Sequence, residues 1–211
     1  EAGAATITLE LLAKARELAD VVEVVMAGDA AAVAAELGEH GAATVHTIGA
    51  LNGGLVGPRL ASAIAAATEA GDGPNVLLCG TTYDGRDVAG RLSVKLDVPV
   101  STNVVDLAVS GDRLIGQEPG FGGTKDVFTG FTGDGPAIFL IRPKSFPAEP
   151  SAGPAATVAG LEVGDLGGTG GAMVGERFVE ESSGPRLDEA NIVVSGGRGL
   201  GDAEKYEMIE T

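Results

Sequence analysis

The sequence predicts an α/β fold, a doubly wound and mostly parallel sheet followed by the start of a second α/β domain. Apolar helical stripes alternate with short β-branched runs over the first 98 residues, and the links between them are short, which is typical of a parallel sheet. A β-rich stretch follows up to residue 141. Near residue 191 an apolar run, a glycine-rich turn and a helical segment occur in succession, which indicates that another α/β unit begins there.

Local signals place the elements of the first 98 residues. The apolar stripe of Leu11, Ala15 and Leu18 predicts the first helix, with Thr6 or Thr8 as its N-cap. Asp29 and Asp84 are expected to cap later helices, and the pair Gly57-Pro58 opens another. In order, we expect helix 8–20, strand 21–27, helix 30–37, strand 43–48, a helix from 57, strand 76–79 and helix 84–96.

The remaining residues divide the chain into three parts. Strands at 104–109, 113–117, 126–131 and 137–141 continue the same sheet or form a small added layer, which completes a first domain over residues 1–146. Four prolines between 143 and 154 mark residues 147–190 as a linker and extended crossing segment, in which 172–179 could form one strand. Residues 191–211 then predict a strand at 191–195, a turn and a helix from 203.

The net charge restricts the partners of the chain. In the 211 residues, 14 Lys and Arg face 30 Asp and Glu, so the formal net charge is −16. Such a chain repels the phosphate backbone of nucleic acids and the surface of anionic membranes. Self-repulsion is tolerable in strong salt, where the screening length falls to about 3 Å at 1 M, and this predicts a halophilic source. A hydrophobic share of 44% excludes a disordered polyanion.

Cysteine, histidine and hydropathy patterns exclude several kinds of site. The lone Cys79 lies in an apolar run, where a buried structural thiol is expected. His40 and His46 lack the spacing of a zinc-binding helix. There is no run of about 18 apolar residues and no basic N-terminal region typical of a signal peptide, so we expect no membrane insertion and a cytoplasmic protein.

Two turns are candidate ligand sites, each with a structural alternative. The turn over residues 195–201 places Gly197, Arg198 and Gly199 between a predicted strand and a helix, where an anion could bind. The spacing differs from the dinucleotide fingerprint, whose third glycine is replaced by Asp202, so a tight structural turn is at least as consistent. The turn over residues 81–87 follows a buried strand, and there a helix cap and a ligand site are equally supported.

Four further segments carry a family pattern: Thr8-Leu-Glu-Leu-Leu12, Gly80-Thr-Thr-Tyr-Asp-Gly-Arg-Asp-Val-Ala89 with Arg91-Leu92, Leu140-Ile-Arg-Pro-Lys-Ser-Phe146, and Asn191-Ile-Val-Val-Ser-Gly-Gly-Arg-Gly-Leu200. In their order and spacing, these segments resemble the alpha subunit of electron transfer flavoproteins. The resemblance implies a nucleotide-binding-type α/β domain without catalytic residues, followed over residues 191–211 by the beginning of an FAD-binding domain. It also implies an apolar strand before the first helix, although only residues 1–6 precede that helix here.

The resemblance implies an electron carrier with no substrate-converting site of its own. Arg198 would contact FAD, Gly197 and Gly199 would shape its turn, and most other flavin contacts would lie beyond Thr211. The implied partners are the beta subunit, with a place for AMP in it, the flavin dehydrogenases and a respiratory quinone-linked acceptor. Two other hypotheses remain, a standalone nucleotide-binding regulator of the universal-stress type and a docking module without a cofactor.

Overall fold

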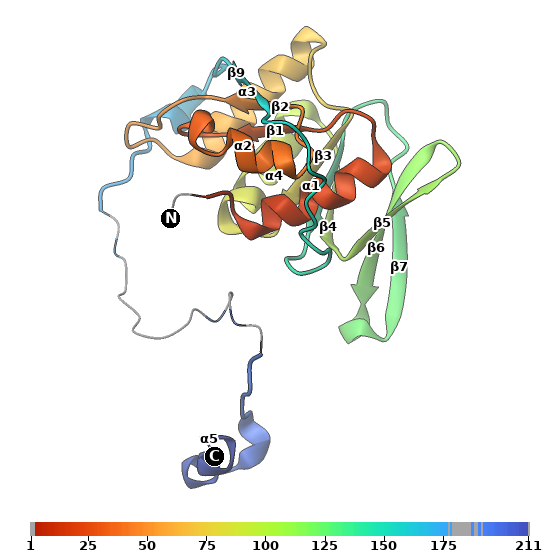
Figure 1. The fold of residues 1–211 in the computed structure, drawn as a ribbon, viewed down its shortest axis with the longest axis vertical. Helices are drawn as coiled ribbons and strands as arrows, with labels where there is room; N and C mark the ends of the chain where they lie inside the picture. The colour runs from red at the N-terminus through yellow and green to blue at the C-terminus, as the bar shows by residue number, and fades with distance from the viewer. Residues whose placement is uncertain (1–2, 177, 179–186, 188–189, 191, 211) are drawn as a thin grey trace. The chain divides into compact units, whose positions relative to one another are not determined.

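The computed structural model describes residues 3–176, 178, 187, 190 and 192–210. The chain separates into two compact units, Glu1–Gly175 and Glu176–Thr211. The first unit contains all the strands and all but one of the α-helices of the described residues, and the second contains 3-10 turns and one four-residue α-helix (Figure 1). The α/β class with parallel sheets is confirmed, and each unit is described below by itself.

The first unit contains four α-helices and nine strands among its described residues. The helices are α1 (Thr6–Leu18), α2 (Ala34–Glu39), α3 (Val56–Ala70) and α4 (Tyr83–Leu96), with 3-10 turns η1 (Ala30–Ala32), η2 (Phe121–Gly123) and η3 (Gly167–Gly171). The strands are β1 (Glu23–Met26), β2 (Thr44–Thr47), β3 (Val76–Gly80), β4 (Val100–Val104), β5 (Asp106–Ser110), β6 (Arg113–Gly120), β7 (Lys125–Gly130), β8 (Ala137–Ile141) and β9 (Thr157–Gly160).

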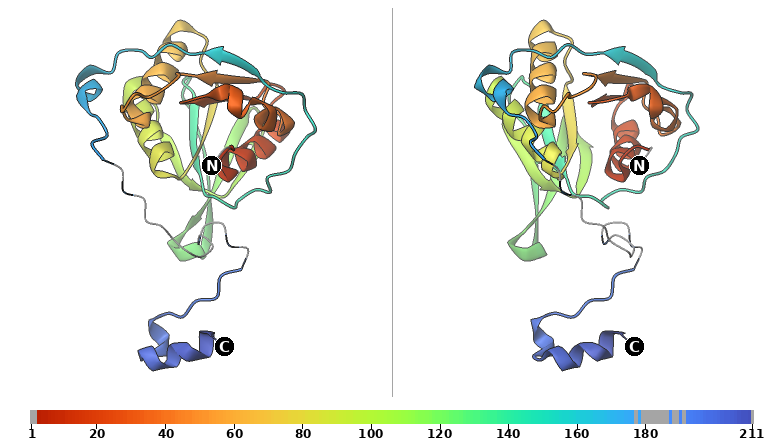
Figure 2. Two further views of the ribbon diagram at one scale, coloured as in Figure 1. Left: turned by 60° about the vertical axis from the view of Figure 1, so that its left-hand side comes forward. Right: turned by 90° about the vertical axis from the view of Figure 1, so that its left-hand side faces the viewer.

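These strands form three separate three-stranded sheets. Two are parallel, with the orders β1-β2-β9 and β3-β8-β4, and the third is antiparallel, with the order β5-β6-β7. The antiparallel sheet is the hairpin layer that projects beside α1 (Figures 1 and 2). Of the two arrangements that the sequence left open for the β-rich stretch, the structure therefore has the added layer, and only β8 and β4 extend a parallel sheet.

Helices cover both faces of the β3-β8-β4 sheet. On one face, Leu140 of β8 packs in a buried cluster with residues of α3 and α4, such as Ile64 and Leu92. Its neighbour Phe139 points the other way and packs with Leu11 of α1, because successive strand residues face opposite sides. Leu12 of α1 also joins the core of the other parallel sheet, so this helix touches both sheets. Burial on both faces explains why these strands read as continuous apolar runs.

Each parallel sheet ends in a strand with one unpaired edge. Among the described residues, β1 pairs only with β2, and β3 pairs only with β8, so no ladder joins β1 to β3. The two sheets are joined instead by side chains, since Val25 of β1 packs against the same cluster as Leu77 of β3. We call these two edges the open edges. An unpaired edge carries N–H and C=O groups that call for a partner.

The chain between β8 and β9 ties the two parallel sheets together. This crossing segment, residues 142–156, is held at one end by the Glu10 carboxylate, which accepts from the backbone N–H of Lys144 at 2.8 Å. Farther on, Arg16 donates to the carbonyl of Glu149 at 3.0 Å. Gly38 of α2 is needed beneath it, because a Cβ there would overlap the carbonyl of Pro154. The sequence predicts an extended crossing segment here, but it does not predict β9. This four-residue edge strand directly follows a proline-rich stretch of the chain.

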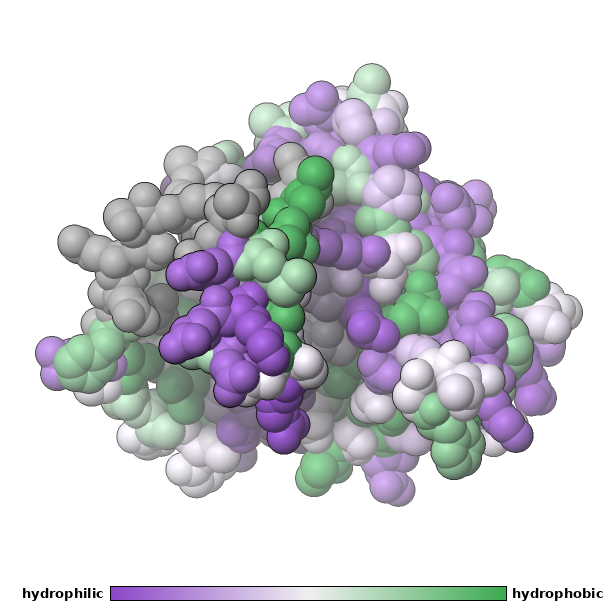
Figure 3. All heavy atoms as spheres, turned by 90° about the horizontal axis from the view of Figure 1, so that it is seen from below, coloured by the Kyte–Doolittle hydropathy of each residue, from purple (hydrophilic) through white to green (hydrophobic). Residues whose placement is uncertain are grey.

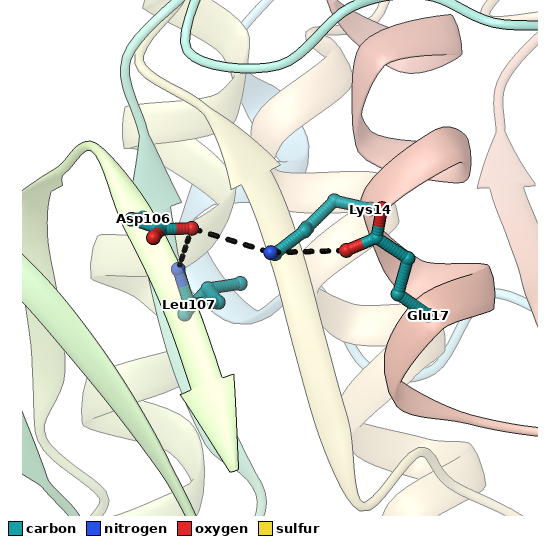
Figure 4. Close-up of polar contacts among 4 residues, drawn as sticks. All are labelled: Lys14, Glu17, Asp106 and Leu107. Carbon is teal, nitrogen blue, oxygen red and sulfur yellow. Dashed lines mark hydrogen bonds and ion pairs between the residues drawn. The ribbon is translucent and has the colours of Figure 1, made fainter.

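Lys14 connects α1 to the antiparallel layer. Its Nζ lies 3.2 Å from Asp106 Oδ1 and 3.1 Å from Glu17 Oε2, and the same Asp106 oxygen accepts from the N–H of Leu107 (Figure 4). The ammonium also lies 5.3 Å from the centre of the Phe146 ring. Burial lowers the pKa of Lys14, but the hydrogen bonds and charges of Glu17 and Asp106 outweigh it, so the net shift is upward and the side chain stays charged.

Several local predictions differ from the structure. Helix α1 has Ala5 at its N-cap with no side-chain hydrogen bond, and α4 is capped by Thr82, whose Oγ1 accepts from the N–H of Gly85, while Asp84 lies in the first turn. The expected cap Asp29 is present, but it precedes the 3-10 turn η1. The strand expected at 104–109 is split between β4 and β5, because Val104 still pairs with Ile141 of β8 whereas the N–H of Val105 already donates to the carbonyl of Gln117 of β6.

The strand expected at 172–179 does not form in the described part of that range. Met173 makes only an isolated antiparallel bridge with Gly54, and residues 177 and 179 lie outside the described residues. The second unit contains the turns η4 (Arg198–Leu200) and η5 (Ala203–Tyr206) and the short helix α5 (Glu207–Glu210). Residues 192–195 form no strand there, residue 191 lies outside the described residues, and the side chain of Ile192 is 85% exposed.

Candidate functional site

The candidate turn of the second unit is a single 3-10 turn around Arg198. Gly197 is its N-cap, and the N–H groups of Leu200 and Gly201 donate to the carbonyls of Gly197 and Arg198 at 3.0 and 3.2 Å. Gly201 then reverses the chain with a φ of 84°, a conformation that favours glycine. The predicted turn between an apolar run and a helical segment is therefore present, although the run itself forms no strand.

The glycines of this turn have different roles. A Cβ at Gly196 would overlap the side chain of Leu200 and meet Ile209 and Tyr206, so this glycine allows the turn to pack on the helical segment behind it. Gly197 and Gly199 have no atom within 4 Å of a built Cβ. Nothing in the described chain fills the space next to these two predicted site residues, and they leave the backbone of the turn accessible to a ligand.

The Arg198 side chain is exposed and makes no ion pair or hydrogen bond within the described residues. Asp202, which stands where the fingerprint has glycine, is instead engaged by Lys205, with 3.5 Å between Oδ2 and Nζ. The carboxylate is thereby partly neutralised, which reduces its repulsion of an anionic ligand. A free guanidinium with five N–H donors suits the phosphates or the polar edge of a flavin.

The turn that follows β3 is both a helix cap and part of a cavity. Thr82, and not the expected Asp84, caps α4, and Asp87 accepts from Arg91 Nε at 2.8 Å. Thr81 and Arg86 meanwhile line a cavity of about 480 Å³ at the carboxyl ends of β3, β8 and β4. A helix cap is therefore present in this segment, and the ligand site stays a prediction.

A second cavity, of about 230 Å³, lies between α3, α4 and residues 164–165. Its polar groups serve packing, because Ser62 Oγ and Lys95 Nζ both donate to the carbonyl of Asp165 at 2.6 and 3.2 Å. Gly164 lets the chain approach α3 closely here, since a Cβ would lie 3.0 Å from the carbonyl of Ser62.

Cys79 lies on β3 beside the open edges and has no sign of reactivity. Desolvation by burial raises the pKa of its thiol from 9.0 to about 12, so it is protonated at physiological pH. The side chain is only half-buried, and the protonated thiol is the less reactive form. Among the described residues no group of three or more His, Cys, Asp or Glu could hold a metal ion. No helix in the described ranges is both long and apolar enough to cross a membrane.

Comparison with known proteins now decides the family. Residues 1–166 match the model of the electron transfer flavoprotein domain. The chain belongs to this family. The match covers the two parallel sheets, the antiparallel layer and the crossing segment. It therefore argues against the alternative hypothesis of a standalone regulator of the universal-stress type.

The relatives are alpha subunits. The chain is 29% identical over 208 residues to electron transfer flavoprotein subunit alpha of Mycobacterium leprae, which covers 97% of this chain and 63% of the relative. Against subunit alpha of Paracoccus denitrificans the identity is 33% over 205 residues, or 96% and 63% of the two chains. The Megasphaera elsdenii alpha subunit is 26% identical over 212 residues, or 95% and 62%. The chain thus spans less than two thirds of the length of these relatives.

Within this electron transfer flavoprotein domain, the motifs that were separate in the sequence lie close together. The Thr8–Leu12 segment meets the Leu140–Phe146 segment through Glu10 and Lys144, and the latter meets the turn after β3 through the cavity. Arg142, Thr102 and Asn103, which also line the cavity, were not singled out from the sequence. Their position at the carboxyl ends of parallel strands is the signal that could have identified them.

Proposed function

We propose that this chain is part of an electron transfer flavoprotein alpha subunit that carries electrons through FAD between flavin dehydrogenases and a respiratory quinone-linked acceptor. The observation that carries the proposal is the family match over residues 1–166, together with relatives that are alpha subunits over nearly the whole chain. In this proposal the protein is an electron carrier with no substrate-converting site of its own.

The proposed role of this chain toward FAD is to bind and orient it. The flavin itself, when bound, accepts and donates the electrons. Arg198 would hold the cofactor by charge-assisted hydrogen bonds, and Gly197 and Gly199 would let it approach the backbone. The fit is supported by the free guanidinium and by the empty space at both glycines. The second unit would then be the beginning of the FAD-binding domain, and residues 1–146 and 147–190 the first domain and its linker.

A doubly wound sheet of the nucleotide-binding type is part of the same proposal. We propose that the complete protein places one strand between β1 and β3, which would join the two parallel sheets into one. Support comes from the open edges and from α1, which contacts both sheets. A native sheet that pairs β1 directly with β3 would contradict it.

The proposed setting is a heterodimer with the beta subunit, which would hold AMP, in the cytoplasm of a halophile. The charge of −16 supports the salt requirement. Screening of carboxylate repulsion should raise the thermal midpoint between about 0.1 M and about 2 M KCl. Circular dichroism melting curves at these salt concentrations measure it, and a flat or falling midpoint would count against the halophilic source.

The flavin proposal is tested on the full-length alpha–beta complex. A charge-assisted hydrogen bond is worth about 1.5–3 kcal/mol, so Arg198→Ala should weaken FAD binding about 10–150-fold. Flavin fluorescence titration measures the affinity. Arg113→Ala is the matched control, because this arginine is also exposed but lies on β6 of the first unit next to Asp112. Equal FAD affinities of wild type and Arg198→Ala would remove Arg198 from the site.

A further inference from the structure

Backbone hydrogen bonds of the first unit define the cavity of about 480 Å³ at the carboxyl ends of β3, β8 and β4. The hydrogen-bond ladder between β3 and β8 continues past the end of β3. There the N–H of Thr81 donates to the carbonyl of Ile141 at 2.8 Å. Next to it, the N–H of Arg142 donates to the carbonyl of Val104 at 2.9 Å. The backbone around the cavity is therefore fixed by three strands at once, at the edge where parallel sheets bind ligands.

Two unpaired arginines line this cavity. Within the described residues, neither Arg86 nor Arg142 makes an ion pair or a side-chain hydrogen bond. Arg91 pairs with Asp87 and Arg16 donates to two backbone carbonyls, whereas Arg59 also makes no ion pair or side-chain hydrogen bond among the described residues but lies outside the cavity. In a chain with a net charge of −16, two guanidinium groups that line one cavity without a carboxylate partner supply positive charge for an anion.

Other elements hold the lining in place. The buried Glu10 of α1, only 4% exposed, accepts from the N–H of Lys144 and so fixes the turn that carries Arg142 and Pro143. On the other side, β4 shifts register between Ser101 and Val104, which brings Thr102 and Asn103 to the cavity. Thr and Asn side chains supply further hydrogen-bond donors for an oxyanion.

We propose that this cavity binds the phosphate group of a small ligand, with Arg86 and Arg142 as its charged contacts. Planar guanidinium groups match phosphate oxygens in pairs, which favours phosphate over a simple halide ion. The volume lies within the usual range of small-molecule sites, about 300–1,000 Å³. Leu140 and Pro143 add an apolar wall for the part of the ligand that carries the phosphate. The residues of this cavity belong to the first unit, and the proposed flavin contact Arg198 belongs to the second.

Calorimetric titration of the full chain with three probes at constant ionic strength tests the proposal. The probes are inorganic phosphate, ribose 5-phosphate and ribose. We expect both phosphates to bind and ribose not to bind. Tighter binding of ribose 5-phosphate would identify a phosphorylated small molecule as the ligand type, and equal binding of the two would identify the free anion. No phosphate binding up to about 10 mM, or equal binding of ribose, would overturn the proposal.

Variants locate the site. Arg86→Gln and Arg142→Gln should each weaken phosphate binding by about tenfold or more, since each removes a charge-assisted contact. Arg86 is exposed on the first turn of α4, so its replacement should leave the fold intact, which circular dichroism checks. Arg113→Gln is the control, with one positive charge fewer on β6 and outside both proposed sites. An equal loss in this control would show a general charge effect and would overturn the site.

Discussion

Two segments of this chain share one sequence pattern and differ in structure. Residues 76–96 and residues 192–209 each contain an apolar run, a glycine-containing turn with an arginine, and a helical segment. The first forms strand β3, a capped turn and the 14-residue helix α4. The second forms an extended run without a strand partner, a 3-10 turn and the four-residue helix α5.

The difference follows from what surrounds each segment. β3 pairs along its whole length with β8, and α4 buries Val88, Ala89 and Leu92 against the sheet. In the second unit, hydrophobic side chains are exposed, as at Ile192 and Val194, which are 85% and 71% exposed. Figure 3 shows one face of the molecule, on which both hydrophobic and hydrophilic residues are exposed. Strand and helix propensities become structure only where neighbouring elements bury the apolar side.

Thiol chemistry gives the largest expected contrast between the two segments. Two proteins with a single thiol are compared, the wild type with Cys79, and Cys79→Val combined with Ser195→Cys in the exposed run. At pH 8 the thiolate fraction at a pKa of about 12 is roughly 10³ smaller than at the usual value, so iodoacetamide should alkylate Cys79 roughly 10³-fold more slowly.

The pH dependence of this reaction has a defined sign. A raised pKa means that the rate at Cys79 keeps rising about tenfold per pH unit toward pH 12, whereas the exposed thiol should level off above about pH 8.5. Mass spectrometry measures both rates, and equal rates in denaturant serve as the control. Levelling of the native Cys79 rate near pH 8.5 would contradict the buried, protonated thiol.

Truncation of one isoleucine in each region tests the same contrast in stability. Ile138 of β8 is fully buried, so Ile138→Ala should lower the free energy of unfolding by about 2–5 kcal/mol. Ile192→Ala should change it by less than about 0.5 kcal/mol, since the side chain is exposed. Urea unfolding followed by circular dichroism gives both values. A loss at Ile192 as large as that at Ile138 would mean that the apolar run of the second unit is buried in solution.

Two glycines within helices test the effect of packing, because replacement of each by alanine adds a single methyl group. Gly38→Ala should destabilise the protein by about 1–3 kcal/mol, because the new Cβ would overlap the backbone of the crossing segment. Gly90→Ala in α4 has open space and should stabilise it by about 0.5–1 kcal/mol through lower backbone entropy. Thermal melting should therefore shift in opposite directions, and shifts of the same sign would refute this account of Gly38.

The sequence predicted the elements whose signals are local. Apolar periodicity identified α1, α3 and α4 and the buried strands β3 and β8, because each buries a continuous stripe or run. Apolar periodicity missed β9, because this short strand pairs with β2, whose Thr44 is distant in the chain. It also predicted a strand at 191–195, but residues 192–195 form none, because the described residues supply no neighbouring strand to bury them. For the sites, the sequence singled out Arg198, which stays a prediction, whereas Arg142 and Asn103 come together at one cavity only in three dimensions.

The late position of β9 has a consequence for synthesis on the ribosome. The chain leaves β8 at Ile141, crosses the unit, and only then pairs Thr157 with Thr44 of β2. A nascent chain emerges N-terminus first, so the outer edge of β2 is uncovered throughout the synthesis of α3, α4 and the hairpin layer. Such a long-range pairing forms slowly, and an uncovered strand edge attracts other chains in the meantime. Translational pausing after residue 160 would give this edge time to close before the second unit appears.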